Sequence, residues 1–126
     1  MNSKWKVALG VLAGAALGAG AIEMLHAQAK PPAYFVAEIQ TIDQEALRPY
    51  GAAAPGTIAA NCGKFMVRGG TLIPVEGEAP KGRIVVIGFD SLDKAQSWYK
   101  SEDYQKILPI RLKNTNSRAY IVEGAN

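Results

Sequence analysis

One short apolar run constrains the fold of this chain more than any other feature of its sequence. Residues 84–87 read Ile-Val-Val-Ile, and Phe89 follows after a glycine. β-Branched residues are typical of strands, so the run predicts a strand over residues 84–89. A strand with one face in water alternates apolar and polar residues, whereas this run is apolar on both faces. The sheet that contains it must therefore be covered on both sides.

Two helices are predicted directly after this strand. Ser91 is the expected N-cap of the first, because its hydroxyl can accept hydrogen bonds from the first free backbone amides. Apolar residues then recur at helical spacing, namely Leu92, Ala95, Trp98 and Tyr99. Ser101 repeats the cap signal for a second helix with Tyr104, Ile107 and Leu108 inward, and Pro109 is expected to limit that helix.

The chain before the run predicts a strand and a long helix. Residues 33–40 alternate, which places Phe35, Ala37 and Ile39 on one face and Tyr34, Val36 and Glu38 on the other. A helix follows from Asp43, its N-cap, to about Asn61. Two internal prolines, Pro49 and Pro55, predict a break or kink near residues 51–56, and Gly63 is expected to take the left-handed conformation that ends the helix.

Two further strands complete the pattern. Residues 64–68 form one, with Phe65 and Val67 opposite Met66 and Arg68. Gly69-Gly70 predicts a bulge or bend, after which residues 71–75 are expected to stay extended. The last strand is predicted over residues 117–123.

The resulting order, β-α-β-β-α-β, is that of the ferredoxin-like fold, an α+β fold with an antiparallel sheet and helices on one face. The opposite face, carrying Val85, Ile87 or their neighbours, would be an apolar patch of the kind that monomers avoid. We therefore expect a homodimer that pairs through the sheet face.

The first 29 residues have the order of a secretory signal peptide. Lys4 and Lys6 precede an apolar run over residues 7–22, and Ala27-Gln28-Ala29 offers small residues for cleavage. We expect residues 1–29 to be removed, leaving a periplasmic or secreted domain over residues 30–126 with no stable membrane association. The alternative is an uncleaved anchor, although the run is short for a span of ~20 residues.

The exported part lacks the residues of several classes of site. His26, the single histidine, leaves with the leader, which excludes Ser-His-Asp and Cys-His catalysis and histidine-based metal sites. We predict no metal and no cofactor. The basic residues are scattered, so no nucleic-acid partner is predicted either. The single cysteine, Cys62, is expected to be a buried small residue at a helix end.

Four charged residues are candidates for a small-molecule site. Arg68 can hold a carboxylate through two parallel hydrogen bonds, and Arg111 and Arg118 can join it in an anion site. For Arg68 we favour the simpler expectation of an ion pair with Glu38 or Glu76, and for the other two arginines a place on the surface or at an interface. Burial of Glu38 would raise its pKa and make it a possible general base, although a partnered interface carboxylate is the favoured expectation.

Aromatic residues form the second group of candidates. Trp98, Tyr99 and Tyr104 can form a stacking wall for an aromatic ligand, but their helical spacing favours the core. Tyr34 is expected to point into the dimer face.

Four segments, in this order along the chain, resemble a small bacterial domain known as domain of unknown function 1330. They read CGKFMVRGG at 62–70, RIVVIGFDSL at 83–92, SWYKSEDYQ at 97–105 and IVEG at 121–124. The resemblance runs from about Tyr34 to Gly124. It implies a ferredoxin-like fold of the dimeric α/β-barrel group, whose relatives include cofactor-free monooxygenases and isomerases, and it implies no established activity. An exported form departs from the usual cytoplasmic one.

Two functions remain open from the sequence. The first is a homodimer that binds a small anionic or aromatic molecule, with a cofactor-free enzyme as its variant. The second is a non-catalytic periplasmic interaction module, which the missing histidine and the missing nucleophile-and-base pair favour.

Overall fold

Four strands and three helices make up residues 30–126, the part of the chain that this computed structural model describes. The predicted signal peptide, residues 1–29, lies outside the described residues. In chain order the elements are β1 (Ala33–Thr41), α2 (Gln44–Ala60), β2 (Lys64–Arg68), β3 (Arg83–Phe89), α3 (Leu92–Lys100), α4 (Glu102–Asn114) and β4 (Thr115–Glu123). The first and last strands are slightly longer than predicted.

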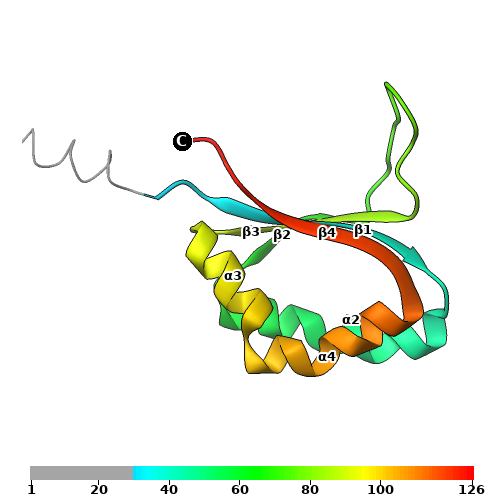
Figure 1. The fold of residues 1–126 in the computed structure, drawn as a ribbon, viewed down its shortest axis with the longest axis horizontal. Helices are drawn as coiled ribbons and strands as arrows, with labels where there is room; N and C mark the ends of the chain where they lie inside the picture. The colour runs from blue at the N-terminus through cyan, green and yellow to red at the C-terminus, as the bar shows by residue number, and fades with distance from the viewer. Residues whose placement is uncertain (1–29) are drawn as a thin grey trace, which may run out of the picture. The chain divides into compact units, whose positions relative to one another are not determined.

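The strands form one antiparallel sheet in the order β2-β3-β1-β4. This is the ferredoxin-like arrangement, with α3 and α4 together in the place of the second helix. All three helices lie on one face of the sheet, and no helix of residues 30–126 covers the other, which we call the open face (Figure 1). The predicted α+β fold with its helices on one face is confirmed.

The core lies between the sheet and the helices. Phe35 of β1 pairs with Ile87 of β3, and Ala37 pairs with Val85, so these four side chains share the helix face. Trp98 and Tyr104 are 0% exposed, and their ring centroids are 4.2 Å apart, which confirms the prediction that they belong to the core. The open face was expected to carry Val85, Ile87 or their neighbours, and the structure selects the neighbours, because Val85 and Ile87 face the helices. The alternation of β3 leaves Ile84 and Val86 on the open face instead.

The predicted helix starts are confirmed by their caps. Asp43 accepts a hydrogen bond from the backbone amide of Ala46 (3.1 Å), and Ser91 accepts from that of Lys94 (3.2 Å). Ser101 accepts from Tyr104 (3.3 Å), so α4 begins immediately after α3. Each cap satisfies an amide that has no partner within its own helix.

The prolines do not interrupt the helices, so the predicted break in the first helix is wrong, while a kink stays a prediction. Helix α2 runs unbroken through Pro49 and Pro55, and α4 continues past Pro109 to Asn114. Each proline removes one hydrogen bond and crowds the carbonyl four residues earlier. Packing of the inward faces onto the core, through Ile58 of α2 and Leu108 of α4, outweighs that cost.

The end of α2 differs from the prediction in one residue. Cys62, not Gly63, has the left-handed conformation (φ 60°), and it is exposed rather than buried. The amide of Cys62 donates to the carbonyl of Ala59 (3.0 Å) and that of Gly63 to the carbonyl of Ile58 (2.9 Å), the pattern of a Schellman motif. Gly63 serves another need, because a Cβ there would lie 2.6 Å from the ring of Phe89.

The bulge of β2 lies earlier than predicted. Phe65 pairs with Ile87, but Val67 pairs with Val86 and Arg68 with Val85, so the register shifts between Phe65 and Val67. One extra residue reverses which face the following side chains occupy. Arg68 therefore shares the helix face with Phe65 instead of opposing it. Residues 71–75 are not part of a strand, because the chain leaves the sheet after Arg68.

Candidate functional site

A small cavity lies between the helix face of the sheet and helices α2 and α4. Its volume is about 90 Å³. Its wall is largely apolar, and one tyrosine, Tyr50, and three arginines, Arg68, Arg83 and Arg111, interrupt it. The apolar part consists of Phe35, Ile39, Leu47, Gly51, Ala54, Ile58, Phe65, Val85 and Ile87.

Arg111 is the buried charge at this cavity. Its side chain belongs to the same inward face of α4 as Tyr104 and Leu108, and the residue is 2% exposed. One guanidinium nitrogen, Nη1, donates to the hydroxyl of Ser117 (2.7 Å), while Nε is buried without a hydrogen-bond partner. This placement corrects the expectation that Arg111 lies on the surface or at an interface.

Two tyrosines flank Arg111. The hydroxyls of Tyr50 and Tyr104 are 2.7 Å apart, and the guanidinium carbon of Arg111 is 5.8 Å from the ring centroid of Tyr50. Burial disfavours the charged form of Arg111, but the nearby oxygens of Tyr104 and Tyr50 outweigh this effect and raise the pKa of Arg111 above its ordinary value. The guanidinium is therefore charged at any physiological pH.

Arg68 and Arg83 lie at the exposed side of the cavity. The bulge in β2 turns Arg68 to this side, where its guanidinium carbon lies 4.3 Å from the ring centroid of Phe65. Arg83 begins β3 on the same face as Val85, and its guanidinium lies against Gly69, where a Cβ would come within 2.5 Å of Nε. The three arginines thus approach one cavity from three elements, β2, β3 and α4.

No acidic residue lines the cavity in the described part of the chain. Glu38 forms an ion pair with Arg118 instead of Arg68, and no ion pair joins Arg68 to Glu76 among residues 30–126. Hence the favoured expectation of an ion pair between Arg68 and Glu38 or Glu76 is wrong. Arg111 is thus a buried charge whose neighbours Ser117, Tyr50 and Tyr104 supply hydroxyl oxygens and no opposite charge.

Glu38 and Arg118 lie away from this cavity, on the open face. Glu38 accepts hydrogen bonds from Nε and Nη2 of Arg118 (3.0 and 2.6 Å) and from the backbone amide of Lys81 (2.8 Å). The amide of Lys81 first, and then Arg118, hold the pKa of Glu38 below its ordinary value. The raised pKa that burial would cause is contradicted, and the favoured expectation that Glu38 is partnered is confirmed, while its place at an interface stays a prediction. Arg118 is 78% exposed, so it lies at the surface, one of the two places expected for it.

The aromatic candidates are also separated from the cavity. Trp98 and Tyr104 do not line it, because both are enclosed in the core. Tyr34 is half-buried, and it shares the open face with Glu38. Of the candidates from the sequence, the structure therefore brings Arg68 and Arg111 together at the cavity and places the others elsewhere.

Sequence reasoning missed Tyr50 and Arg83. The signal for Arg83 was present, because alternation along β3 places it on the same face as Val85, Ile87 and Phe89. For Tyr50 the spacing to Ala54 and Ile58 was present as well, but the predicted break in the helix hid it.

Two classes of site are absent from residues 30–126. No group of three or more His, Cys, Asp or Glu side chains is arranged to hold a metal ion among these residues. None of the helices described is long and apolar enough to cross a bilayer.

Comparison with solved structures shows the same fold in three cases. The methylated RPA0582 protein is 12% identical with a TM-score of 0.61, and covers 85% of this chain and 91% of its own. RPA0582 of Rhodopseudomonas palustris, a protein of unknown function, is 14% identical in another structure with a TM-score of 0.56, covering 85% and 93%. A dimeric ferredoxin-like protein of unknown function from Thermobifida fusca is 14% identical with a TM-score of 0.52, covering 75% and 92%.

Among curated proteins, no relative matches this chain. A family described as "Domain of unknown function (DUF1330)" matches residues 32–125. That range includes every strand and helix of the described structure, together with the three arginines of the cavity. The chain therefore belongs to the DUF1330 family, as its motifs indicated.

Proposed function

We propose that this protein is an exported homodimer that binds a small carboxylate in the cavity beside Arg111. The observation that carries the proposal is the buried guanidinium, which has a free Nε and no acidic neighbour among the described residues. A carboxylate in the cavity would supply the opposite charge that the described residues around Arg111 lack. Arginine is suited to this role, because its planar fork matches the geometry of a carboxylate.

The size of the cavity limits the ligand. A volume of about 90 Å³ is below the ~150 Å³ of an engineered apolar cavity that binds benzene. It suits a short aliphatic acid, or the acidic end of a longer molecule whose remainder leaves past Arg68 and Arg83. An aromatic ligand needs the cavity to widen, so the anionic alternative is the better supported of the two.

Export and dimerisation are parts of the same proposal. The basic, apolar and small-residue order of residues 1–29 supports a periplasmic or secreted location. Exposed apolar side chains on the open face support pairing with a second copy, and the similar protein from Thermobifida fusca is described as dimeric.

Ligand binding is tested by calorimetric titration of protein purified after expression of the full chain. The titrants are short aliphatic carboxylates, with the uncharged amides of the same acids as controls. We expect acids to bind and amides not to bind, and acid binding to raise the melting temperature. Arg111→Met should abolish binding, whereas Arg48→Met, at an exposed ion pair with Glu45, should preserve it.

The outcomes separate the proposal from its alternatives. Equal binding of acids and amides, or full binding by Arg111→Met, would overturn the carboxylate site. A cofactor-free enzyme remains the second candidate, since the Tyr50 side chain lines the cavity and can donate a proton. Mass spectrometry of the acid recovered after incubation distinguishes a binding protein from an enzyme. A binding protein leaves the mass of the acid unchanged, whereas an enzyme converts it to a product.

A further inference from the structure

The segment between β2 and β3, residues 69–82, projects from the sheet; we call it the arm. It rises on the side of the open face, opposite the helices (Figure 1). β2 ends at Arg68 and β3 begins at Arg83, and irregular loops of about 12–15 residues or more are uncommon unless they have a function. The arm joins neighbouring antiparallel strands, for which a turn of two residues would be enough.

Both ends of the arm are fixed to the sheet. At one end the amide of Gly69 donates to the carbonyl of Ile84 (2.9 Å). At the other end the amide of Lys81 donates to the carboxylate of Glu38 (2.8 Å), and Gly82 (φ 85°) packs so closely on β1 that a Cβ would overlap the carbonyl of Ile39. The base of the arm is therefore held in one position.

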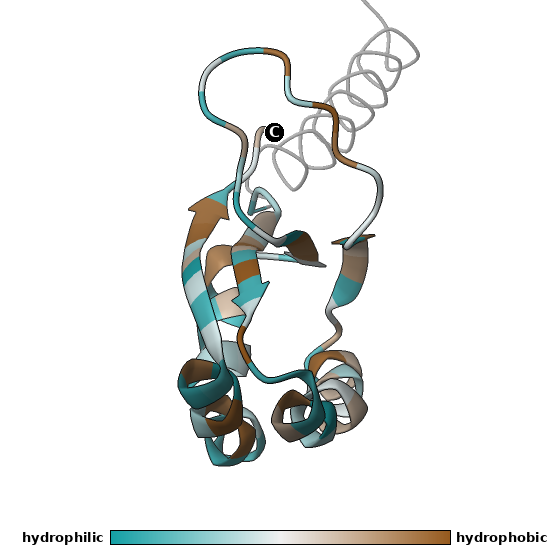
Figure 2. Cartoon of the chain, turned by 90° about the vertical axis from the view of Figure 1, so that its right-hand side faces the viewer, coloured by the Kyte–Doolittle hydropathy of each residue, from teal (hydrophilic) through white to brown (hydrophobic). Residues whose placement is uncertain are grey.

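The arm exposes apolar side chains. Ile73 is 78% exposed, Val75 is 87% exposed and Leu72 is 39% exposed. Figure 2 shows these hydrophobic stretches on the loop that stands clear of the sheet. Full burial of one such side chain is worth about 1.5–3 kcal/mol, so the arm presents a binding surface that its own protomer does not use.

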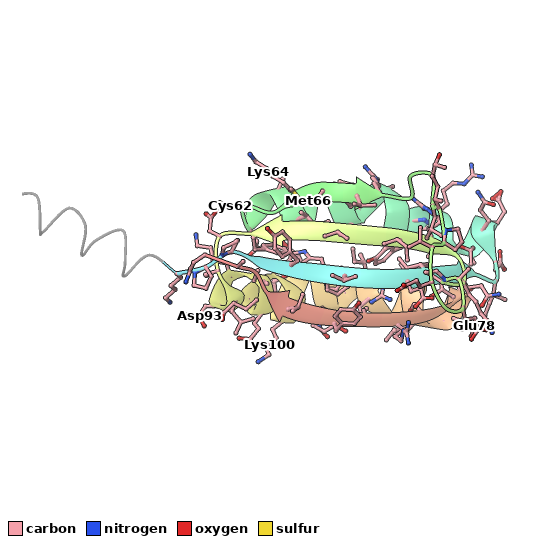
Figure 3. All side chains as sticks on the ribbon, turned by 90° about the horizontal axis from the view of Figure 1, so that it is seen from above. Cys62, Lys64, Met66, Glu78, Asp93 and Lys100 are labelled. Atoms are coloured by element: carbon pink, nitrogen blue, oxygen red, sulfur yellow. The ribbon has the colours of Figure 1, made fainter. Side chains whose placement is uncertain are left out.

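The open face has a polar end and an apolar end. Beneath the arm, the paired positions Glu38–Arg118 and Gln40–Asn116 border an open trough of about 410 Å³ together with arm residues 78–81. Toward the other end of the strands three large apolar side chains are exposed, Met66, Tyr120 and Val122, with Lys64 beside them on β2. Figure 3 looks onto this face, with Glu78 over one end of the strands and Cys62, Lys64 and Met66 displaced toward the other.

This separation determines what the arm can cover. Over its own sheet the arm borders a trough whose strand residues are polar, namely Glu38, Gln40, Asn116, Ser117 and Arg118, and Ile73 and Val75 stay exposed. A second copy placed face to face, with its strands running the opposite way, brings its apolar end beneath the arm. The same operation places the partner's arm over the first copy, as twofold symmetry requires.

We propose that the arm of each protomer packs on the apolar end of the open face of a second copy, in a reciprocal exchange. This inference rests on the proposed homodimer and goes beyond it, because it assigns the residues and the orientation. Ile73 and Val75 of one copy lie on Met66, Tyr120 and Val122 of the other.

The first test measures the dimer dissociation constant by sedimentation, using protein purified after expression of the full chain. Ile73→Lys should raise this constant roughly tenfold or more, because a charge replaces a buried side chain. Leu112→Lys is the matched control. Leu112 is 56% exposed on α4, so the substitution introduces the same charge on the helix side of the protein. It should leave the constant unchanged, and circular dichroism should show both variants folded.

The second test is a cross-link in a Cys62→Ser background. A copy with Ile73→Cys and a copy with Val122→Cys are co-expressed, and oxidation should give a disulfide-linked dimer that contains one of each. The arm exchange would be overturned if the wild-type protein is a dimer, Ile73→Lys leaves its dissociation constant unchanged and no mixed cross-link forms. The proposed homodimer would remain supported by that result. A wild-type monomer at micromolar concentration would overturn both, without affecting the carboxylate site.

Discussion

The phenolic oxygens of Tyr50 and Tyr104 lie 2.7 Å apart, and this contact joins α2 to α4 beside the cavity. Tyr104 is enclosed in the core, whereas Tyr50 lines the cavity, so the pair couples the packing of two helices to the wall of the site. Arg111 lies against the same pair. The position of the Tyr50 hydroxyl in the cavity wall therefore depends on its hydrogen bond to Tyr104 of the core.

Tyr104→Phe should make unfolding less dependent on alkaline pH. Burial raises the pKa of Tyr104 above its ordinary value of 10.0, so the folded state keeps the proton at a pH where the unfolded state loses it. The stability from this proton is complete below about pH 10 and declines as pH rises further. Tyr104→Phe should cost about 0.5–1.5 kcal/mol at pH 7 and flatten the alkaline decline, as urea unfolding across pH 7–11 would measure. Tyr120→Phe, at an exposed position, should leave the profile unchanged.

Glu38→Gln should make the protein less sensitive to acid. The amide of Lys81 and Arg118 hold the pKa of Glu38 below its ordinary value of 4.5, so the folded state releases this proton more readily than the unfolded state. The stabilisation is present above about pH 4.5 and is lost as pH falls through the lower folded value. Melting temperatures from pH 7 down to pH 3 should fall less steeply in the variant. An equally steep fall would show that this carboxylate does not govern the acid response.

Thr57→Val should destabilise the protein although it preserves shape. The hydroxyl of Thr57 accepts the hydrogen bond of the Trp98 indole (3.0 Å), and Trp98 is 0% exposed. Without that acceptor the indole N–H is buried and unpaired, at a cost of about 1–3 kcal/mol in the free energy of unfolding. Thr57→Ser keeps the hydroxyl and should recover most of the loss. Equal loss in both variants would mean that the methyl group, not the hydrogen bond, matters.

Cys62→Gly should stabilise the end of α2. A non-glycine residue in the left-handed conformation costs about 1–2 kcal/mol, and Cys62 has φ 60°. Since glycine also gains freedom in the unfolded chain, we expect a net gain of roughly 0.5–1 kcal/mol. Gly63→Ala should act in the opposite direction, because its Cβ would lie 2.6 Å from Phe89 and 2.8 Å from Ile58. Chemical unfolding of the two variants measures both effects.

The fold was predictable because its signals are local. Strand alternation, three helix caps and the two-sided apolar run all belong to short segments of sequence, and together they specify the order of elements. The prolines misled the prediction, since the cost of a proline is local but the packing that offsets it involves Ile58 and Leu108, which meet the core from different helices.

The site was less predictable because its geometry depends on long-range register. Arg68 reaches the cavity through a bulge that becomes visible only when β2 is paired with β3. Arg111 shares the helical spacing of Tyr104 and Leu108, but Pro109 was expected to limit this helix, and Arg111 was expected at the surface or at an interface. The helical pattern also cannot show that no carboxylate of residues 30–126 lines the cavity beside Arg111. That depends on the side chains that other elements bring to the cavity.

The proposed carboxylate site would also respond to the medium. If it binds carboxylates, chloride, formate and acetate should compete for the guanidinium of Arg111, because no acidic side chain of residues 30–126 lines the cavity. Apparent affinity for any organic acid should therefore fall as the concentration of small inorganic anions rises, even at constant pH. Occupancy of the site would then depend on the concentration of small anions in solution as well as on that of its ligand.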